Sequence, residues 1–316
     1  MKRTSLTLMV LVLITASLMV MGVYVGSTGW AIPVDQLLWD IRLPRSLGAW
    51  LAGALLGLSG AIAQGLFRNP LADPYLLGSA AGSTLAVSFM LIFFGAGGGW
   101  WLSLGLTGAA FIGAMAAVLL TLTLARGVQN TLQLLLAGVI VGVVAGAANS
   151  LLTTFHPETL QTMQAFMLGS TAFVDMRACL LMALALAVCL TIGLLFSRFL
   201  DGLALGEETA QSLGLSVPLF RMGLIGVLAL ATGAVVAQTG LIAFVGLAAP
   251  HIIRATIRIK HAGLMALSSI VGGCLLLAAD ILARGLIAPQ ELPVGVLTAV
   301  LGGGYLLFRM YRWKRS

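Results

Sequence analysis

Charged residues are scarce in this sequence. Asp, Glu, Lys and Arg make up only 9% of the 316 residues, whereas hydrophobic residues make up 60% and the mean hydropathy is +1.08. Such a composition excludes a water-soluble globule, whose surface needs many charged side chains. One membrane span takes about 20 apolar residues, so the length allows roughly ten spans with short connections. We therefore predict an all-α polytopic membrane protein whose residues 1–316 form a single transmembrane domain.

Cysteine is also rare, with three in the chain. Cys179 and Cys189 lie on one predicted helix at a separation of about 15 Å, which is too far for a disulfide. We interpret Cys274 as a packing residue. This usage excludes a disulfide scaffold and gives no information about the redox compartment. His156 stands beside Pro157 with no second ligand nearby, so we interpret it as a loop residue and expect no metal site in the chain.

Catalytic motifs are absent from the sequence. It contains no GxxxxGK[ST] phosphate loop, no HExxH, no CxxC and no nucleophile elbow, and its glycines lie within apolar runs rather than in a dinucleotide-binding turn. The chain is therefore not expected to be an enzyme, to bind a cofactor or to hydrolyse ATP by itself. The net charge of +7 does not require nucleic acid as a partner, because membrane proteins collect Lys and Arg in cytoplasmic loops.

Apolar runs separated by polar residues predict ten spans. They cover residues 5–25, 43–65, 76–94, 102–124, 132–154, 177–196, 219–237, 241–259, 264–282 and 293–310. The first run suits either a signal peptide or a retained helix, and its length favours the helix. Prolines at 70 and 74 predict irregular backbone between the second and third spans, and residues 158–169 predict a short surface helix after the fifth.

Counting basic residues predicts the orientation of these spans. Alternating the loops places 13 of the 17 Lys and Arg residues on one side, which is then the cytoplasm, with both termini there. Four arginines remain on the outer side: Arg42, Arg45, Arg177 and Arg284. We interpret an arginine at the end of a span either as a lipid anchor, or as the partner of a nearby acid such as Asp40 or Asp280, or as a contact for another protein.

Glycine is abundant, with 39 residues, and many lie four residues apart. This spacing occurs at Gly53 and Gly57 and in the run Gly138, Gly142 and Gly146. Small residues at such intervals let membrane helices approach closely, so the run of three predicts one crowded helix face.

The polar stretch at residues 201–221, DGLALGEETAQSLGLSVPLFR, interrupts the apolar runs. Glu207 and Glu208 suit the positive end of a short helix, Gly214 suits the left-handed residue that closes it, and Pro218 suits the first turn of the next helix. The alternative interpretation of this stretch is an ordinary solvated loop.

Six separated motifs resemble the permease subunits of bacterial ABC importers for iron chelates, haem and cobalamin, the type II importers. They are RLPR at 42–45, NPLADP at 69–74, LALGEETAQSLGL at 203–215, GLIAFVGLAAPHIIR at 240–254, ADILAR at 279–284 and ELPVGVLTAVLG at 291–302. The resemblance implies a permease of the inner membrane that moves its cargo by alternating access. Ferric siderophore is the first-ranked candidate for the cargo, and haem and cobalamin rank after it.

The resemblance also implies partners and contact residues. Two ATP-binding subunits, which use ATP and Mg²⁺, are expected inside, a substrate-binding protein outside, and a second permease, identical or related, beside this one. The cytoplasmic segment at 199–218 is expected to contact the ATPase through Leu205, Gly206, Glu207, Glu208, Ala210, Leu213 and Gly214. Arg42, Arg45 and Arg284 are expected to receive acids of the binding protein.

Two other classes of transporter remain as alternatives. A secondary transporter driven by protons or sodium usually carries ionisable groups at mid-membrane. In this sequence Asp280 falls in the last turn of the ninth predicted span and Asp73 in the proline-broken loop, so no acid lies near a span centre. A channel would show a ring of like charge, which the sequence does not suggest.

Overall fold

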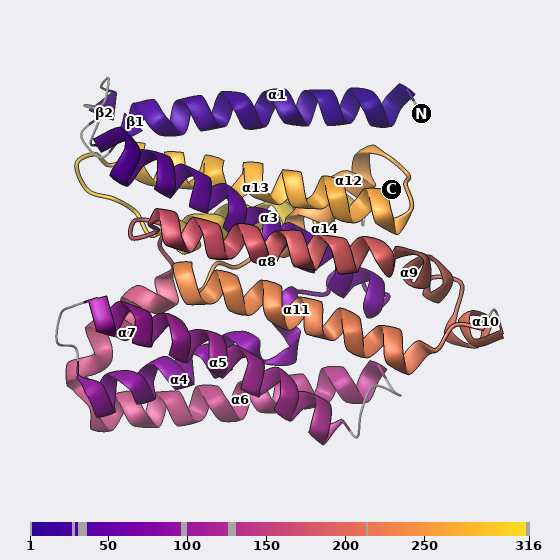
Figure 1. The fold of residues 1–316 in the computed structure, drawn as a ribbon, viewed down its shortest axis with the longest axis horizontal. Coiled ribbons are helices and arrows are strands. Elements are labelled where there is room, and N and C mark those ends of the chain that lie inside the picture. The colour runs from indigo at the N-terminus through magenta and orange to yellow at the C-terminus, as the bar shows by residue number, and fades with distance from the viewer. Residues whose placement is uncertain are drawn as a thin grey trace.

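The chain forms a bundle of long helices that lie side by side (Figure 1). The structure is a computed structural model, and it describes residues 2–26, 29–30, 37–95, 100–125, 131–212 and 214–313. The long helices are α1 (Lys2–Tyr24), α3 (Leu43–Leu66), α4 (Ser79–Phe94), α5 (Trp100–Leu124), α6 (Thr131–Phe155), α8 (Met176–Leu195), α11 (Val217–Thr239), α13 (His261–Gly285) and α14 (Val294–Trp313).

Shorter elements connect these helices. They are the antiparallel pair β1 (Val25–Gly26) and β2 (Gly29–Trp30), η1 (Leu38–Arg42), η2 (Pro74–Leu77), η3 (Pro157–Thr159), α7 (Leu160–Leu168), α9 (Ser197–Leu203), α10 (Glu207–Ser212) and α12 (Val245–Thr256). The irregular backbone predicted after the second span is confirmed, because η2 replaces a regular helix there. Its first turn is capped by Asp73, whose side chain accepts a hydrogen bond from the backbone N–H of Tyr75. The short surface helix predicted at 158–169 corresponds to η3 and α7.

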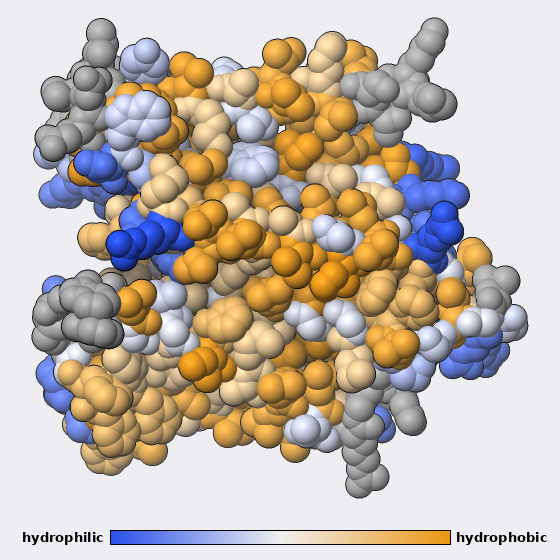
Figure 2. All heavy atoms as spheres, in the orientation of Figure 1, coloured by the Kyte–Doolittle hydropathy of each residue, from blue (hydrophilic) through white to orange (hydrophobic). Residues whose placement is uncertain are grey.

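Seven helices in the described part of the chain are long and apolar enough to cross a membrane, and 79–94 and 294–308 form shorter apolar helices. In Figure 2 the middle of the molecule is mainly apolar, and hydrophilic residues gather at the two ends of the bundle. The helical membrane fold is therefore confirmed, and ten spans with both termini inside stay a prediction.

The eighth span is shorter than predicted. Residues 241–259 were expected to cross the membrane, but α12 has 12 residues and rises only about 18 Å, against a hydrocarbon core of about 30 Å. The backbone of Phe244 is left-handed, with φ of 69°, so the helix starts after it. At the other end Ile257 is extended and ends the helix.

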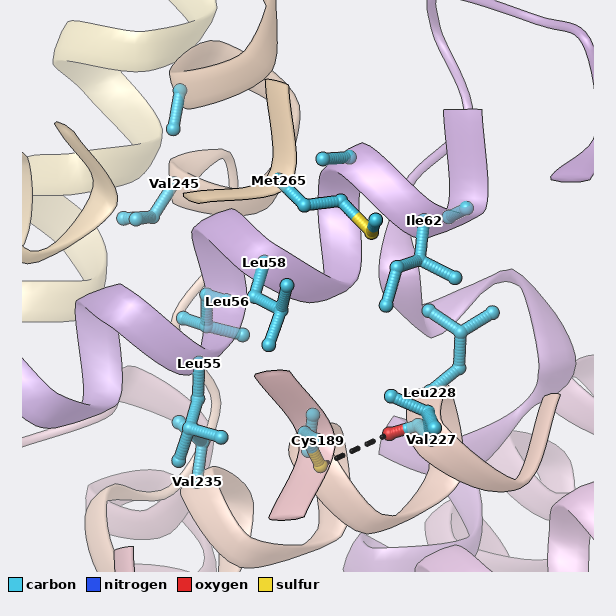
Figure 3. Close-up of a cluster of buried hydrophobic side chains, with 14 of the residues drawn as sticks. Leu55, Leu56, Leu58, Ile62, Cys189, Val227, Leu228, Val235, Val245 and Met265 are labelled. Atoms are coloured by element: carbon cyan, nitrogen blue, oxygen red, sulfur yellow. Dashed lines mark hydrogen bonds between the residues drawn. The ribbon is translucent and has the colours of Figure 1, made fainter. Parts of the chain in front are cut away.

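Helix α3 is the centre of the bundle, and its most apolar window is 89% buried, against 6% for α1. Leu55, Leu56, Leu58 and Ile62 of α3 point toward side chains of α8, α11, α12 and α13 (Figure 3). Since lipid is as apolar as leucine, this core is held by close packing more than by exclusion from the solvent.

Glycines allow the neighbouring helices to reach the α3 backbone. A Cβ on Gly53 would lie 2.2 Å from the carbonyl oxygen of Gly272, and one on Gly57 would lie 2.1 Å from that of Ser268. The predicted close approach at this pair is confirmed. In the predicted run on α6, only Gly138 is crowded, by the carbonyl of Leu76. Gly142 and Gly146 have no atom of another described element within 4 Å of a built Cβ, so within this chain the crowding of that face is limited to Gly138, and one continuous crowded face stays a prediction.

We expect Gly60→Ala to destabilise the bundle. A Cβ at this position would lie 1.7 Å from the carbonyl oxygen of Gly246, so α3 and α12 would have to separate. Overpacking of this kind costs about 1–3 kcal/mol, which should lower the midpoint of thermal unfolding in detergent. Gly226→Ala is the matched control, because nothing lies within 4 Å of its Cβ. Equal midpoints for the two variants would contradict the tight crossing.

Candidate functional site

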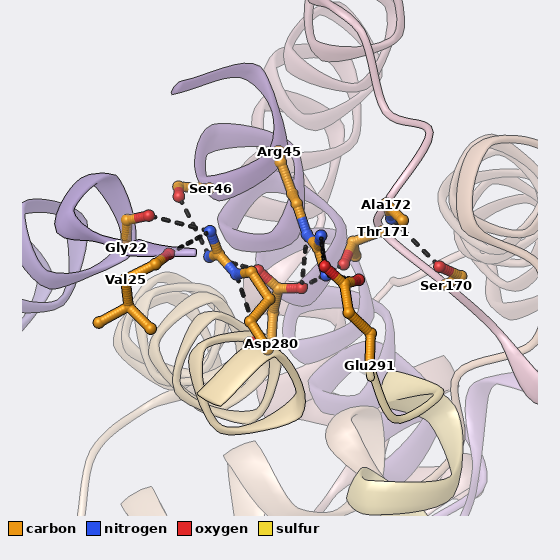
Figure 4. Close-up of polar contacts among 10 residues, drawn as sticks. Gly22, Val25, Arg45, Ser46, Ser170, Thr171, Ala172, Asp280 and Glu291 are labelled. Carbon is orange, nitrogen blue, oxygen red and sulfur yellow. Dashed lines mark hydrogen bonds and ion pairs between the residues drawn. The ribbon is translucent and has the colours of Figure 1, made fainter. Parts of the chain in front are cut away.

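The polar residues form two candidate sites at opposite ends of the bundle. One is the α9–α10 segment, residues 197–215, which Figure 1 shows projecting at the right-hand end. The other is the arginine cluster, which comprises Arg42, Arg45, Arg284, Asp280 and Glu291 and is shown in part in Figure 4.

The short helix predicted in the polar stretch is α10, and both of its ends are as predicted. Glu207 and Glu208 lie in its first turn, where carboxylates favour the positive end of the helix dipole. Gly214 has φ of 81°, and its N–H donates to the carbonyl of Gln211. The next N–H, that of Leu215, donates to the carbonyl of Ala210, so the last turn of α10 is closed by backbone hydrogen bonds. Pro218 lies in the first turn of α11, also as predicted.

Three contacts fix the α9–α10 segment to the bundle. Glu207 Oε2 lies 3.0 Å from Arg221 Nη2 of α11, and the Arg221 side chain is only 1% exposed. Asp201 Oδ1 of α9 lies 2.7 Å from His261 Nδ1 and accepts a hydrogen bond from the His261 backbone N–H at the start of α13. Ala210 is fully buried against the chain itself. A movement of this segment would therefore be transmitted to α11 and α13.

The outer face of the segment is open. Leu205 is 70% exposed, and Glu208, Thr209, Gln211 and Ser212 are exposed on α10. Among the residues expected to contact a partner, Ala210 points inward and positions α10, whereas Leu205 and Glu208 face outward. Gly206 and Glu207 are half-buried. Leu213 lies outside the described residues.

The arginine cluster joins α3 to α13 and to the segment before α14. Arg45 Nε lies 3.1 Å from Asp280 Oδ1, and its two terminal nitrogens each lie 2.9 Å from an oxygen of Glu291. Thr171, in the loop before α8, donates its hydroxyl to the same Asp280 oxygen at 2.5 Å (Figure 4). The paired bonds from one guanidinium to Glu291 have the geometry in which arginine binds carboxylates most strongly.

The other two arginines hold the end of α1. Arg284 Nη2 lies 2.6 Å from Asp280 Oδ2, and its Nη1 donates to the carbonyls of Gly22 and Val25. Arg42 Nη1 donates to the carbonyls of Val23 and Tyr24. The last carbonyls of a helix lack partners within the helix, so these guanidinium groups cap α1 and complement its dipole.

All three predicted docking arginines are buried, with relative exposures of 5% for Arg42, 8% for Arg45 and 2% for Arg284. The pairing with Asp280, which the sequence suggested as an alternative, is present for Arg45 and Arg284. Glu291, Thr171 and the α1 carbonyls were not identified as partners from the sequence. Glu291 stood in a recognised motif, but neither Thr171 nor the α1 carbonyls carried any sequence signal.

We expect Asp280→Asn to destabilise the protein more than Glu291→Gln. The Asp280 side chain is completely buried and pairs with both Arg45 and Arg284. Its loss would leave these two buried cations with only one carboxylate, that of Glu291. Removing one partner of a buried ion pair costs about 3–5 kcal/mol. The Glu291→Gln substitution should cost less stability, because the Glu291 side chain is 28% exposed and water can solvate Arg45 in place of the lost charge. Thermal unfolding of both variants in detergent measures the difference, and an equal or smaller effect of Asp280→Asn would contradict the assigned role.

Comparison with family models gives one match, to the FecCD transport family, over residues 7–312. The chain is 40% identical to the hemin transport system permease protein HmuU of Yersinia pestis, covering 92% of this chain and 88% of that protein. It is 37% identical to the vitamin B12 import system permease protein BtuC of Yersinia pseudotuberculosis, covering 98% and 92%.

Comparison with solved structures agrees with these matches. The chain resembles a structure described as an inward-facing conformation of a putative metal-chelate type ABC transporter, with a TM-score of 0.88, 29% identity and coverage of 96% of this chain and 98% of that one. It also shares its fold with a chain of PsaBC from Streptococcus pneumoniae in complex with Fab, with a TM-score of 0.59, 17% identity and coverage of 83% and 89%.

Proposed function

This chain belongs to the FecCD transport family, and from this membership we propose its cargo, its assembly and its mechanism. It is a permease of an ABC importer in the group that serves metal chelates, haem or cobalamin, and a multi-pass protein of the inner membrane. The observation that carries the proposal is the family match over residues 7–312. A gradient-driven secondary transporter is not favoured.

The proposed cargo is a metal chelate, with ferric siderophore first. Haem is the second candidate, because the haem permease of Yersinia pestis is 40% identical over 92% of this chain. Cobalamin is the third, on the basis of the 37% identical vitamin B12 permease.

The proposed topology has ten spans and both termini in the cytoplasm. In support, α1 begins and α14 ends at the same end of the bundle as α9 and α10 (Figure 1). Three of the four arginines predicted on the outer side, Arg42, Arg45 and Arg284, gather at the opposite end. These arginines and the α9–α10 segment thus lie at opposite ends of the helices, which supports placing the α9–α10 segment and both termini on the cytoplasmic side.

The proposed assembly has two ATPase subunits on the α10 side, a second permease beside this one, and a substrate-binding protein on the arginine side. We propose that ATP and Mg²⁺ bind to the ATPase subunits and not to this chain. The ATPase contact is proposed to involve Leu205, Gly206, Glu207, Glu208, Ala210, Leu213 and Gly214. In support, Leu205 and Glu208 face outward, while Ala210 and the Glu207–Arg221 ion pair hold α10 rigidly behind them.

The proposed mechanism is alternating access. To change an inward-to-outward ratio from 1:99 to 99:1, the nucleotide state must favour one conformation by about 5.5 kcal/mol. That free energy has to reach the spans through a contact that does not deform. The ion pair of Glu207 with Arg221 and the link of Asp201 to His261 connect the α9–α10 segment to α11 and α13, so they are suited to transmit the movement.

Arg42, Arg45 and Arg284 are proposed to form part of the docking surface for the binding protein. Since all three are buried, an incoming carboxylate would have to compete with partners already in place. Arg45 is the best suited, because its partner Glu291 is 28% exposed and can be displaced. Charge reversal of Arg45 or Arg284 is a poor test of docking, because it would set a glutamate against Asp280 inside the chain.

We expect proteoliposomes that contain this permease with its ATPase to take up a metal chelate only when ATP and the loaded binding protein are both present. Uptake of a ferric siderophore, haem and cobalamin, each labelled with radioactive metal, measures the activity and ranks the cargos. The permease alone, tested with proton and sodium gradients, is the control. Uphill uptake by the permease alone would show that the ABC importer proposal is wrong.

We also expect Leu205→Glu to weaken coupling to the ATPase. Leu205 is 70% exposed on the face proposed to meet the ATPase, so a charge there would be desolvated on contact without disturbing the bundle. The stimulation of ATP hydrolysis by loaded binding protein should fall about tenfold or more, while thermal unfolding of the permease is unchanged. Leu205→Met is the matched control and should keep the stimulation. Full stimulation of ATP hydrolysis in the Leu205→Glu variant would show that Leu205 is not part of the ATPase contact.

A further inference from the structure

Phe173 is a fully exposed aromatic side chain on the arginine side of the bundle. Its relative exposure is 94%, and no other large apolar side chain that the structure describes exceeds 75%. The leucines that α8 exposes, such as Leu180 and Leu181, reach 62% and 55%. A side chain on the lipid-facing surface of a helix is partly covered by its own helix, whereas Phe173 lies in the loop at residues 169–175 and keeps 94% of its surface exposed.

The loop that carries Phe173 is fixed at both sides of it. Before it, the N–H of Ser170 donates to the carbonyl of Thr239 at 2.8 Å, and the hydroxyl of Thr171 donates to Asp280. After it, Val174 packs on Gly48 of α3, where a Cβ would lie 2.3 Å from the valine methyl. Asp175 then caps α8 by accepting from the N–H of Ala178. The exposure of Phe173 therefore belongs to an ordered loop rather than to a frayed one.

The position of Phe173 along α8 favours a protein partner over lipid. The 20 residues of α8 rise about 30 Å, which is enough to cross the hydrocarbon core by themselves. Phe173 lies three residues before the helix starts, beyond the helix cap Asp175, and both Asp175 and Arg177 are exposed. An exposed aromatic side chain that lies beyond the end of a membrane-length helix and next to two exposed charged residues has the arrangement of a protein interface, with an aromatic centre and a polar rim.

Figure 4 shows Thr171 and Ala172, the residues before Phe173, beside Arg45, Asp280 and Glu291. Phe173 is the next residue in the chain, and the hydrogen bond from Thr171 to Asp280 connects its loop to the arginine cluster. A partner surface with acidic and apolar side chains would meet three groups in one region. They are the cation Arg45, the carboxylate of Glu291, which can be displaced, and the apolar ring of Phe173.

We propose that Phe173 is the apolar anchor by which the extracytoplasmic substrate-binding protein docks on this permease, held ready by the loop at 169–175. The inference rests on the proposed function and adds a residue that it does not assign. Because the loop is already ordered, docking does not require it to be immobilised, and such preorganisation strengthens binding. Losing the aromatic ring should act mainly on the dissociation rate, as most interface substitutions do.

The first experiment measures the affinity of the binding protein for the permease–ATPase complex in nanodiscs. Phe173→Ala is expected to weaken binding at least tenfold, chiefly through faster dissociation, and Phe173→Leu to weaken it less. Leu181→Ala, on the exposed face of α8, is the matched control and should bind as the wild type does. ATP-driven uptake by Phe173→Ala should recover when the binding protein is saturating. Unchanged affinity in Phe173→Ala would overturn the proposal.

The second experiment distinguishes the binding protein from the other possible occupants. Phe173→Cys is labelled with bimane, since the native cysteines Cys179, Cys189 and Cys274 are buried. A blue shift of the emission on addition of the binding protein supports the proposal. Quenching by brominated lipids in its absence would show a membrane anchor, and a shift caused by permease dimerisation alone would show a second copy. Either result overturns the proposal.

The proposal and the proposed function fail in different ways. If the wild-type complex binds no chelate-loaded binding protein and shows no ATP-driven uptake, the importer function itself is wrong, and the role of Phe173 falls with it. If the wild type binds and transports while Phe173→Ala does so with equal affinity, only the role of Phe173 is lost.

Discussion

The close crossing of α3 with α13 and α12 is the constraint on which the rest of the structure depends. Backbone carbonyls of Gly272, Ser268 and Gly246 occupy the space where Gly53, Gly57 and Gly60 would carry a side chain. In a membrane the helices gain little from hiding apolar groups, so contact over a large backbone surface has to hold them together. With α13 fixed on α3 in this way, Asp280 is brought beside Arg45, from a position 235 residues away in the sequence.

The buried charges at that end are acceptable because they neutralise one another. Arg45 and Arg284 face Asp280 and Glu291, and the carbonyls at the end of α1 use the remaining donors of Arg284. An unpaired guanidinium in this position would cost several kcal/mol, whereas in this cluster each carboxylate lies beside an arginine, which offsets much of that cost. Of the three arginines that were expected to receive a partner, Arg42 and Arg284 therefore attach the lightly packed α1 to the bundle, and Arg45 joins α3 to α13 and to Glu291.

The two ends of the permease expose different kinds of side chain. At the α10 end a six-residue helix exposes several polar groups, the exposed Leu205 lies just before it, and an ion pair to α11 supports it. At the arginine end the charges are directed inward, and an aromatic side chain on an ordered loop is directed outward. A partner at the first end can push on a rigid element, while a partner at the second meets an apolar side chain first and reaches Arg45 only by displacing Glu291.

What the sequence determined by itself was local. Apolar runs of about 20 residues, the acids and Gly214 around α10, and Pro218 in the first turn of α11 follow from hydropathy, helix dipoles and backbone conformation, which depend on neighbours in the chain. Only the tertiary structure decided that Ala210 faces inward, that the helix of the eighth predicted span has only 12 residues, that Gly142 and Gly146 meet no neighbouring helix of this chain, and that Glu291 and Thr171 complete the arginine cluster. Those outcomes depend on which helices meet and at what depth, and residues far apart in the sequence carry no local signal of that meeting.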